Sequence, residues 1–133
     1  MCCAGVLLMG VAPRIPGGGG KFKKAFENLA SAEKTLLWTN PNIGTVNENW
    51  DIVLEKPYAA IYVTVTEYSG SYDTQNSTYV VMGASSYITT RGNYRYCTFD
   101  GTNFHAGIAH TGSGTSYRDV QPYKIYGVVG TEL

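Results

Sequence analysis

Charged side chains are scarce in this sequence, and their charges cancel. Ten Lys and Arg residues balance ten Asp and Glu residues, and the four types together make up 15% of the chain. A protein that binds nucleic acid or an anionic lipid surface usually carries clustered basic residues. We therefore predict neither nucleic acid nor a membrane as a partner. The 133 residues suffice for one domain with a single core.

Cysteine and histidine are also rare. The three cysteines, Cys2, Cys3 and Cys97, are odd in number and two are adjacent, so they predict no disulfide framework and favour a reducing cytosol. We interpret Cys97, inside a predicted strand, as a small buried hydrophobic residue. His105 and His110 are an odd number of positions apart in one predicted strand, which would place them on opposite faces. We expect no metal site and no cofactor.

No pattern of catalytic residues stands out. The acidic residues are scattered, mostly in predicted turns and strand ends, and a glycan-cleaving pair would have to meet in a cleft. Ser113 in Gly112-Ser113-Gly114 resembles a nucleophile elbow only loosely, because no helix follows it. We predict that the protein is not an enzyme. A glycan-cleaving enzyme is the alternative that the sequence leaves open.

Tyrosine is abundant, with eleven residues. Tyrosine suits half-buried strand faces as well as amphipathic recognition surfaces. The tyrosines cannot all fit one small core, so those outside it serve the second face of a sheet, stack on sugar rings or pack across a subunit interface. We select Tyr72 and Tyr117 as candidate ligand-binding residues. They lie in or beside the polar loops at residues 69–77 and 111–116, which we expect to face outward.

Residues 1–20 form an apolar peptide followed by a Pro/Gly linker. The peptide is too short to span a bilayer, which needs about 20 apolar residues, and it lacks the basic leader of a signal peptide. It is either a frayed tail or an anchor that docks into a larger partner. The anchor would use Val6, Leu7, Leu8, Met9 and Val11.

Residues 21–34 predict a short helix. Phe22, Phe26 and Leu29 fall at helical spacing on one face. A helix of about a dozen residues is marginal alone, so this face needs a partner. The face either packs onto its own domain or forms an oligomer contact with other copies.

Residues 35–133 change to a period of two, which predicts a β-domain. Strands are expected at residues 35–39, 50–54, 59–68, 78–83, 87–90, 94–99, 102–110 and 123–129. Asp100-Gly101 predicts a β-hairpin with a type I′ turn, in which both central residues need a positive φ. We predict an antiparallel β-sandwich or jelly roll of seven or eight strands.

Three segments of this domain resemble a known family. Residues 36–42 (LLWTNPN), 58–63 (YAAIYV) and 122–127 (PYKIYG) are similar to the C-terminal β-domain of tail-fibre-like and minor structural proteins of phages and prophages of Gram-positive bacteria. The similarity covers the two ends of about 95 residues and is weaker in the middle. The motifs are structural, so no catalytic residue is carried over.

The resemblance implies a virion structural protein of the tail-fibre or baseplate type. It also implies a homotrimer that is assembled in the cytoplasm of the bacterial host. We expect residues 1–34 to attach the chain to other virion proteins and the β-domain to recognise the host surface, in particular a glycan. The alternatives are a capsid decoration or head-fibre protein and a free carbohydrate-binding module.

Overall fold

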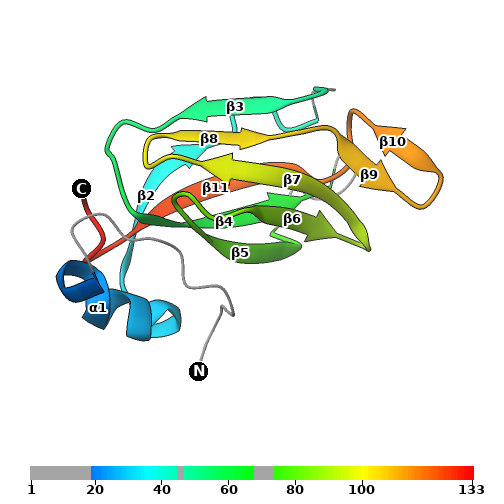
Figure 1. Cartoon of the computed structure of the whole chain (residues 1–133). Coiled ribbons are helices and arrows are strands. Elements are labelled where there is room, and N and C mark those ends of the chain that lie inside the picture. Colours follow the sequence, from blue (N-terminus) through cyan, green and yellow to red (C-terminus); the bar gives the residue numbers. More distant parts are fainter. Residues whose placement is uncertain (1–18, 45–46, 68–73) are drawn as a thin grey trace.

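The protein is all-β. The computed structural model describes residues 19–44, 47–67 and 74–133, and for residues 19–22 it describes the backbone alone. Within these residues, ten strands form two antiparallel sheets packed as a β-sandwich (Figure 1). This confirms the predicted fold class. The strand number exceeds the prediction because residues 102–110 hold two strands and the predicted loop at 111–116 holds another.

The four-stranded sheet joins the two ends of the β-domain. Its order is β2 (Lys34–Thr39), β11 (Gln121–Val128), β4 (Ala60–Thr66) and β5 (Asn76–Val81). β11 runs between β2 and β4, with Ile125 opposite both Trp38 and Val63. The last strand in the sequence therefore closes the sheet beside the first.

The six-stranded sheet is centred on β7 (Asn93–Phe99). One side of β7 pairs with β6 (Ser86–Thr90), and the other pairs with β8 (Asn103–Ala106) and then with β9 (Ala109–Thr111). β3 (Trp50–Val53) extends the sheet beyond β8, and β10 (Gly114–Ser116) extends it beyond β9.

A one-residue bulge separates β8 from β9. Thr98 lies opposite His105 and Tyr94 lies opposite His110, so the strand has one residue more than its partner between these pairs. The Gly107 N–H within the bulge donates to the Tyr96 carbonyl at 2.9 Å. Such a bulge reverses the alternation of side chains along the strand.

Alternating apolar residues from both sheets fill the core. Ile61, Val63 and Val65 of β4 are at most 1% exposed, and Phe104 of β8 is equally buried. Cys97 of β7 is 2% exposed, and burial raises the pKa of its thiol to about 12. Cys97 is therefore an inert core residue, as predicted.

The predicted hairpin at Asp100-Gly101 is present, but its turn type was predicted wrongly. Gly101 has a φ of 107°, whereas Asp100 is not in the positive-φ region that a type I′ turn requires. Instead, Asp100 Oδ1 accepts hydrogen bonds from the N–H groups of Thr102 (3.0 Å) and Asn103 (2.7 Å). These bonds lower the pKa of Asp100 to about 2, with those from Asn103 contributing most.

The predicted helix is shorter than expected and contacts its own domain. Helix α1 (Gly19–Glu27) ends before a 3₁₀ turn, η1 (Leu29–Ser31). The Tyr79 hydroxyl of β5 donates to the Leu29 carbonyl at 2.9 Å, and the Phe26 side chain is half-buried. The Phe22 side chain lies outside the described part. The oligomer contact of this face stays a prediction.

A single buried cation joins three loops at one end of the sandwich. Arg95 of β7 points inward, is 0% exposed and donates six hydrogen bonds of 2.7–3.3 Å to backbone carbonyls. The acceptors are the carbonyls of Asn47, Glu48, Gly107, Tyr117, Asp119 and Val120. Burial lowers the pKa of Arg95 to about 10, so the guanidinium remains charged at neutral pH.

We predict that Arg95→Met lowers the free energy of unfolding by about 3–5 kcal/mol, because the methionine leaves buried carbonyls without donors. Chemical denaturation in urea measures the change. Lys56→Met, which removes an exposed cation, is the matched control and should be nearly neutral. A loss below about 1 kcal/mol, the size of an exposed ion pair, would contradict this structural role.

Candidate functional site

Four aromatic side chains gather on the outer face of the six-stranded sheet. Tyr94 and Tyr96 alternate along β7 with the inward-pointing Arg95, so both face outward. Tyr87 of β6 lies opposite Tyr96, and His110 of β9 lies opposite Tyr94. Residues opposite each other in an antiparallel pair share a face. We call Tyr87, Tyr94, Tyr96 and His110 the aromatic surface.

The rings of the aromatic surface contact one another and remain accessible. Tyr94 and His110 are stacked, with ring centroids 5.0 Å apart and ring planes at 18°. Tyr96 meets Tyr94 edge to face at 5.2 Å and Tyr87 at 6.3 Å. The side chains of Tyr87 and Tyr96 are 56% and 58% exposed. The surface therefore offers a pre-arranged set of rings to a ligand.

Tyr94 of this surface is uncharged at neutral pH. The hydrogen bond with Tyr96 raises the pKa of Tyr94 above its usual value of 10.0, and the neighbouring Tyr87 and partial burial act in the same direction. An uncharged phenol offers both a ring face and a hydroxyl that donates or accepts.

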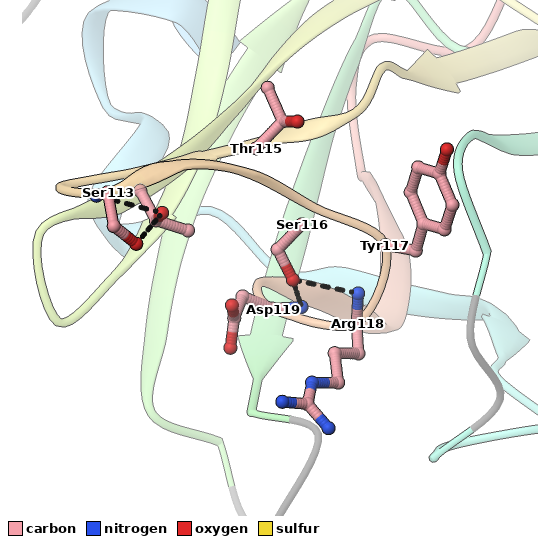
Figure 2. Close-up of a pocket in the computed structure, with 7 residues that line it drawn as sticks. Ser113, Thr115, Ser116, Tyr117, Arg118 and Asp119 are labelled. Carbon is pink, nitrogen blue, oxygen red and sulfur yellow. Dashed lines mark hydrogen bonds between the residues drawn. The ribbon is translucent and has the colours of Figure 1, made fainter.

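A pocket of about 510 Å³ lies where the hairpin of β9 and β10 meets the loop that follows (Figure 2). Its lining is rich in hydroxyl groups and contains one cation and one anion. The lining residues are Thr111, Ser113, Thr115, Ser116, Tyr117, Arg118 and Asp119. We call this the polar pocket.

Two sets of hydrogen bonds hold the loop of the polar pocket. The Ser116 hydroxyl accepts the N–H groups of Arg118 (3.2 Å) and Asp119 (3.3 Å), as Figure 2 shows. The buried Arg95 side chain of β7 also donates to the carbonyls of Tyr117 and Asp119. The loop backbone is therefore held both by the Ser116 side chain and by Arg95.

Val120 marks the end of this loop with an unusual backbone. Its φ is +60°, a region that β-branched residues rarely adopt and that costs about 1–3 kcal/mol. Arg95 Nε donates to the Val120 carbonyl at 2.7 Å, and the Val120 side chain is fully buried. These interactions offset the strain and place the preceding residues at the pocket.

The two histidines share a face, contrary to the prediction. The bulge between β8 and β9 reverses the alternation, so that His105 and His110 both face outward. His105 Nδ1 lies 2.6 Å from Asp51 Oδ1 on the neighbouring strand β3. Sequence spacing could not reveal this pair, because it forms across strands that are 54 positions apart. Among the described residues, no three His, Cys, Asp or Glu side chains gather as a metal site would require.

The predicted site residues are only partly described. Tyr117 is 50% exposed and lines the polar pocket. Tyr72 and the predicted anchor at Val6, Leu7, Leu8, Met9 and Val11 lie outside the described residues. The aromatic surface was not selected from the sequence, although the alternation of Tyr94 and Tyr96 in one strand was a usable signal.

Comparisons with protein-family models, with curated proteins and with solved structures gave no match. In the described residues, no helix has the length and apolar character needed to cross a membrane.

A buried carboxylate lies near the polar pocket. Glu67 directly follows β4, where the register places Thr66 opposite Gln121. Its side chain is 6% exposed, and within the described residues its Oε2 has no hydrogen-bond partner. Burial raises the pKa of Glu67 above 4.5, and the Asp119 carboxylate raises it further, while Arg91 and the Val120 N–H act in the opposite direction.

We predict that Glu67 makes stability depend on pH. Because the folded-state pKa is raised, the contribution of Glu67 is fully present below about 4.5 and is lost as the pH rises through the folded-state value. Glu67→Gln stays neutral, so its stability relative to the native protein should improve over that range. Urea denaturation at a series of pH values measures the difference, with the exposed Glu48→Gln as control. A difference that does not change with pH would contradict the assignment.

Proposed function

We propose that this chain is a structural protein of a phage or prophage virion, and that its β-sandwich recognises carbohydrate on the host surface. The observation that carries the recognition role is the aromatic surface, on which Tyr87 and Tyr96 are more than half exposed. Aromatic rings stack on the apolar faces of sugars, and tyrosine hydroxyls bond to sugar hydroxyls. Binding of this kind is passive and needs no catalytic group.

The virion role is supported by where the family-like segments lie. Residues 36–42, 58–63 and 122–127 overlap with or adjoin β2, β4 and β11, which are neighbours in the four-stranded sheet. The Asn40 side chain, in the first segment, donates to the carbonyl of Pro122, in the last, at 2.8 Å. The resemblance therefore concerns one connected structural unit, although its segments are distant in sequence.

In this proposal, residues 1–34 attach the chain to other virion proteins, and the protein assembles as a homotrimer in the virion. A tail-fibre or baseplate position and a capsid decoration or head-fibre position both suit this arrangement. A map of the particle that locates residues 1–34 distinguishes them.

We predict that deleting residues 1–20 abolishes incorporation into particles and leaves glycan binding unchanged. The reason is that anchor and recognition surface occupy separate parts of the chain. Co-sedimentation of the chain with purified particles measures incorporation, and the full-length chain is the control. If the full-length chain is absent from particles and still binds glycan, a free carbohydrate-binding module is the better description.

We predict that Tyr96→Ala weakens binding to its glycan on an array of bacterial-surface glycans by about tenfold or more, as expected when an exposed aromatic anchor is removed. Tyr117→Ala should also weaken binding. Val53→Ala is the control, because Val53 is 70% exposed on strand β3 at the edge of the same sheet. Unchanged binding in both tyrosine variants would count against this recognition surface.

A further inference from the structure

Polar side chains lie directly beside the aromatic surface, on the same face of the six-stranded sheet. His105 of β8 lies opposite Thr98 of β7 on one side and opposite Asp51 of β3 on the other. Cross-strand partners share a face, so these three residues form one row. Thr98 follows Tyr96 by two positions, and both are exposed while the residues between and beside them are buried. The row of Thr98, His105 and Asp51 therefore continues the surface that Tyr96 belongs to.

A glycine lies where this row meets the aromatic rings. Gly107, in the bulge, donates its N–H to the Tyr96 carbonyl at 2.9 Å and has no side chain to cover the sheet. A methyl group added there would lie 3.9 Å from Asn49 Oδ1 and 4.0 Å from His105 Nε2. Asn49 directly precedes β3, whereas His105 belongs to β8. Polar groups from two segments thus border one uncovered position, and we call Gly107, Asn49 and His105 the Gly107 site.

Asp51 holds the imidazole of His105 in one orientation. His105 Nδ1 lies 2.6 Å from Asp51 Oδ1. A carboxylate only accepts hydrogen bonds, so Nδ1 carries the proton and donates. In the neutral ring, Nε2 is then an acceptor, and this is the atom beside Gly107. The side chains of His105 and Asp51 are 43% and 74% exposed, so a ligand can reach them.

The chemistry of the Gly107 site suits hydroxyl groups. An imidazole Nε2 accepts from a hydroxyl, and the amide of Asn49 both donates and accepts. Tyr96, which is 58% exposed, adds a ring face for apolar C–H groups. A ligand that uses both needs an apolar face next to several hydroxyl groups, which is the chemistry of a sugar ring.

Charge restricts the sugar further. In the described strands β3, β6, β7 and β8, no outward-facing residue is a lysine or an arginine. The carboxylate of Asp51 lies on this face instead. An acidic sugar would therefore meet a carboxylate without a basic side chain of these strands to pair with it, so the face complements a neutral sugar better.

We propose that the Gly107 site is the hydrogen-bonding part of a site for a neutral sugar, and that Tyr96 is its stacking part. One face of the sugar ring lies on Tyr96. One of its hydroxyl groups donates to His105 Nε2 over Gly107, and another bonds to the Asn49 amide. This inference rests on the proposed carbohydrate-binding function, and it adds the charge of the sugar and the residues that select its hydroxyl groups.

An array of bacterial-surface glycans tests the inference, with neutral oligosaccharides printed apart from teichoic acid and uronic acid polymers. The full chain should bind the neutral set. Gly107→Ala should lower this binding by about tenfold or more, because the methyl group occupies the space of the sugar hydroxyls. The substitution itself fits, since the φ of Gly107 is not positive and the methyl contacts are ordinary. Gly112→Ala, at a glycine with open space around it and no positive φ, is the matched control.

A second variant tests the site without touching the bulge. Asn49→Ala removes one hydrogen-bonding group from an exposed side chain, so it should lower binding by about three- to tenfold. Asn42→Ala, at an exposed asparagine in the turn after β2, is its control and should bind as the native chain does. Urea denaturation of each variant verifies that it is folded.

Asp51 is a positioning residue in this proposal, because it acts through His105. Asp51→Ala should weaken glycan binding and should also raise the population of the His105 tautomer that carries its proton on Nε2. Nitrogen-15 NMR shifts of the imidazole measure that population. Unchanged shifts would refute the positioning role of Asp51.

The remaining outcomes separate the inference from the proposed function. Neutral-glycan binding that survives Gly107→Ala and Asn49→Ala, yet is lost in Tyr96→Ala, would refute the Gly107 site and leave carbohydrate recognition intact. A preference for the acidic polymers would refute the neutral ligand. An array without any bound glycan would refute both the inference and the proposed carbohydrate function.

Discussion

The buried guanidinium of Arg95 is the interaction on which both parts of the candidate site depend. A charge taken out of water is costly unless hydrogen bonds replace its hydration, and here six carbonyls do so. One of these carbonyls belongs to Gly107, in the bulge between β8 and β9. That bulge turns His110 toward the outer face. Other carbonyls, those of Tyr117, Asp119 and Val120, belong to the loop of the polar pocket and its end.

The buried Arg95 side chain thus determines how residues are arranged on the outer surface of the sandwich. Tyr94 and Tyr96 face outward because Arg95 between them faces inward, and the charge of Arg95 fixes the loops on either side of their strand. A neutral side chain at this position could fill space but could not satisfy the carbonyls. The strained backbone of Val120 belongs to the same arrangement, since its carbonyl accepts the shortest of the six bonds. Rigid positioning of this kind lowers the entropic cost of ordering the site when a ligand binds.

Most of the fold could be predicted from the alternation of apolar residues along the strands and from the turn residues. The alternation of Ile61, Val63 and Val65 against Tyr62 and Thr64 predicted β4 because one face of a sheet is apolar and its spacing is local. The pairing of β2 with β11 could not be read, because contacts between the two ends of a chain leave no local pattern. The bulge at Gly107 was missed for another reason. One extra residue in a short Gly-containing run changes the parity of every later side chain without changing the composition.

The tyrosines could be counted in the sequence, but only the structure distinguishes their surroundings. A second tyrosine cluster lies on the four-stranded sheet, where Tyr62 meets Tyr79 at 4.8 Å and Tyr126 at 6.1 Å. This cluster is engaged by its own chain: Lys34 Nζ lies 5.0 Å from the Tyr62 ring centroid, and the Tyr62 hydroxyl donates to Ser77 Oγ at 2.6 Å.

The two tyrosine clusters differ in how far other parts of the chain cover them. Tyr79 donates a hydrogen bond to the Leu29 carbonyl in η1, so the segment after α1 contributes to covering the four-stranded sheet. On the six-stranded sheet, in the described part of the chain, Tyr87 and Tyr96 have other aromatic rings as neighbours and stay more than half exposed. Burying an aromatic face is favourable wherever a partner exists. A set of rings that the fold holds together and its own chain leaves open is therefore the stronger candidate for an external ligand.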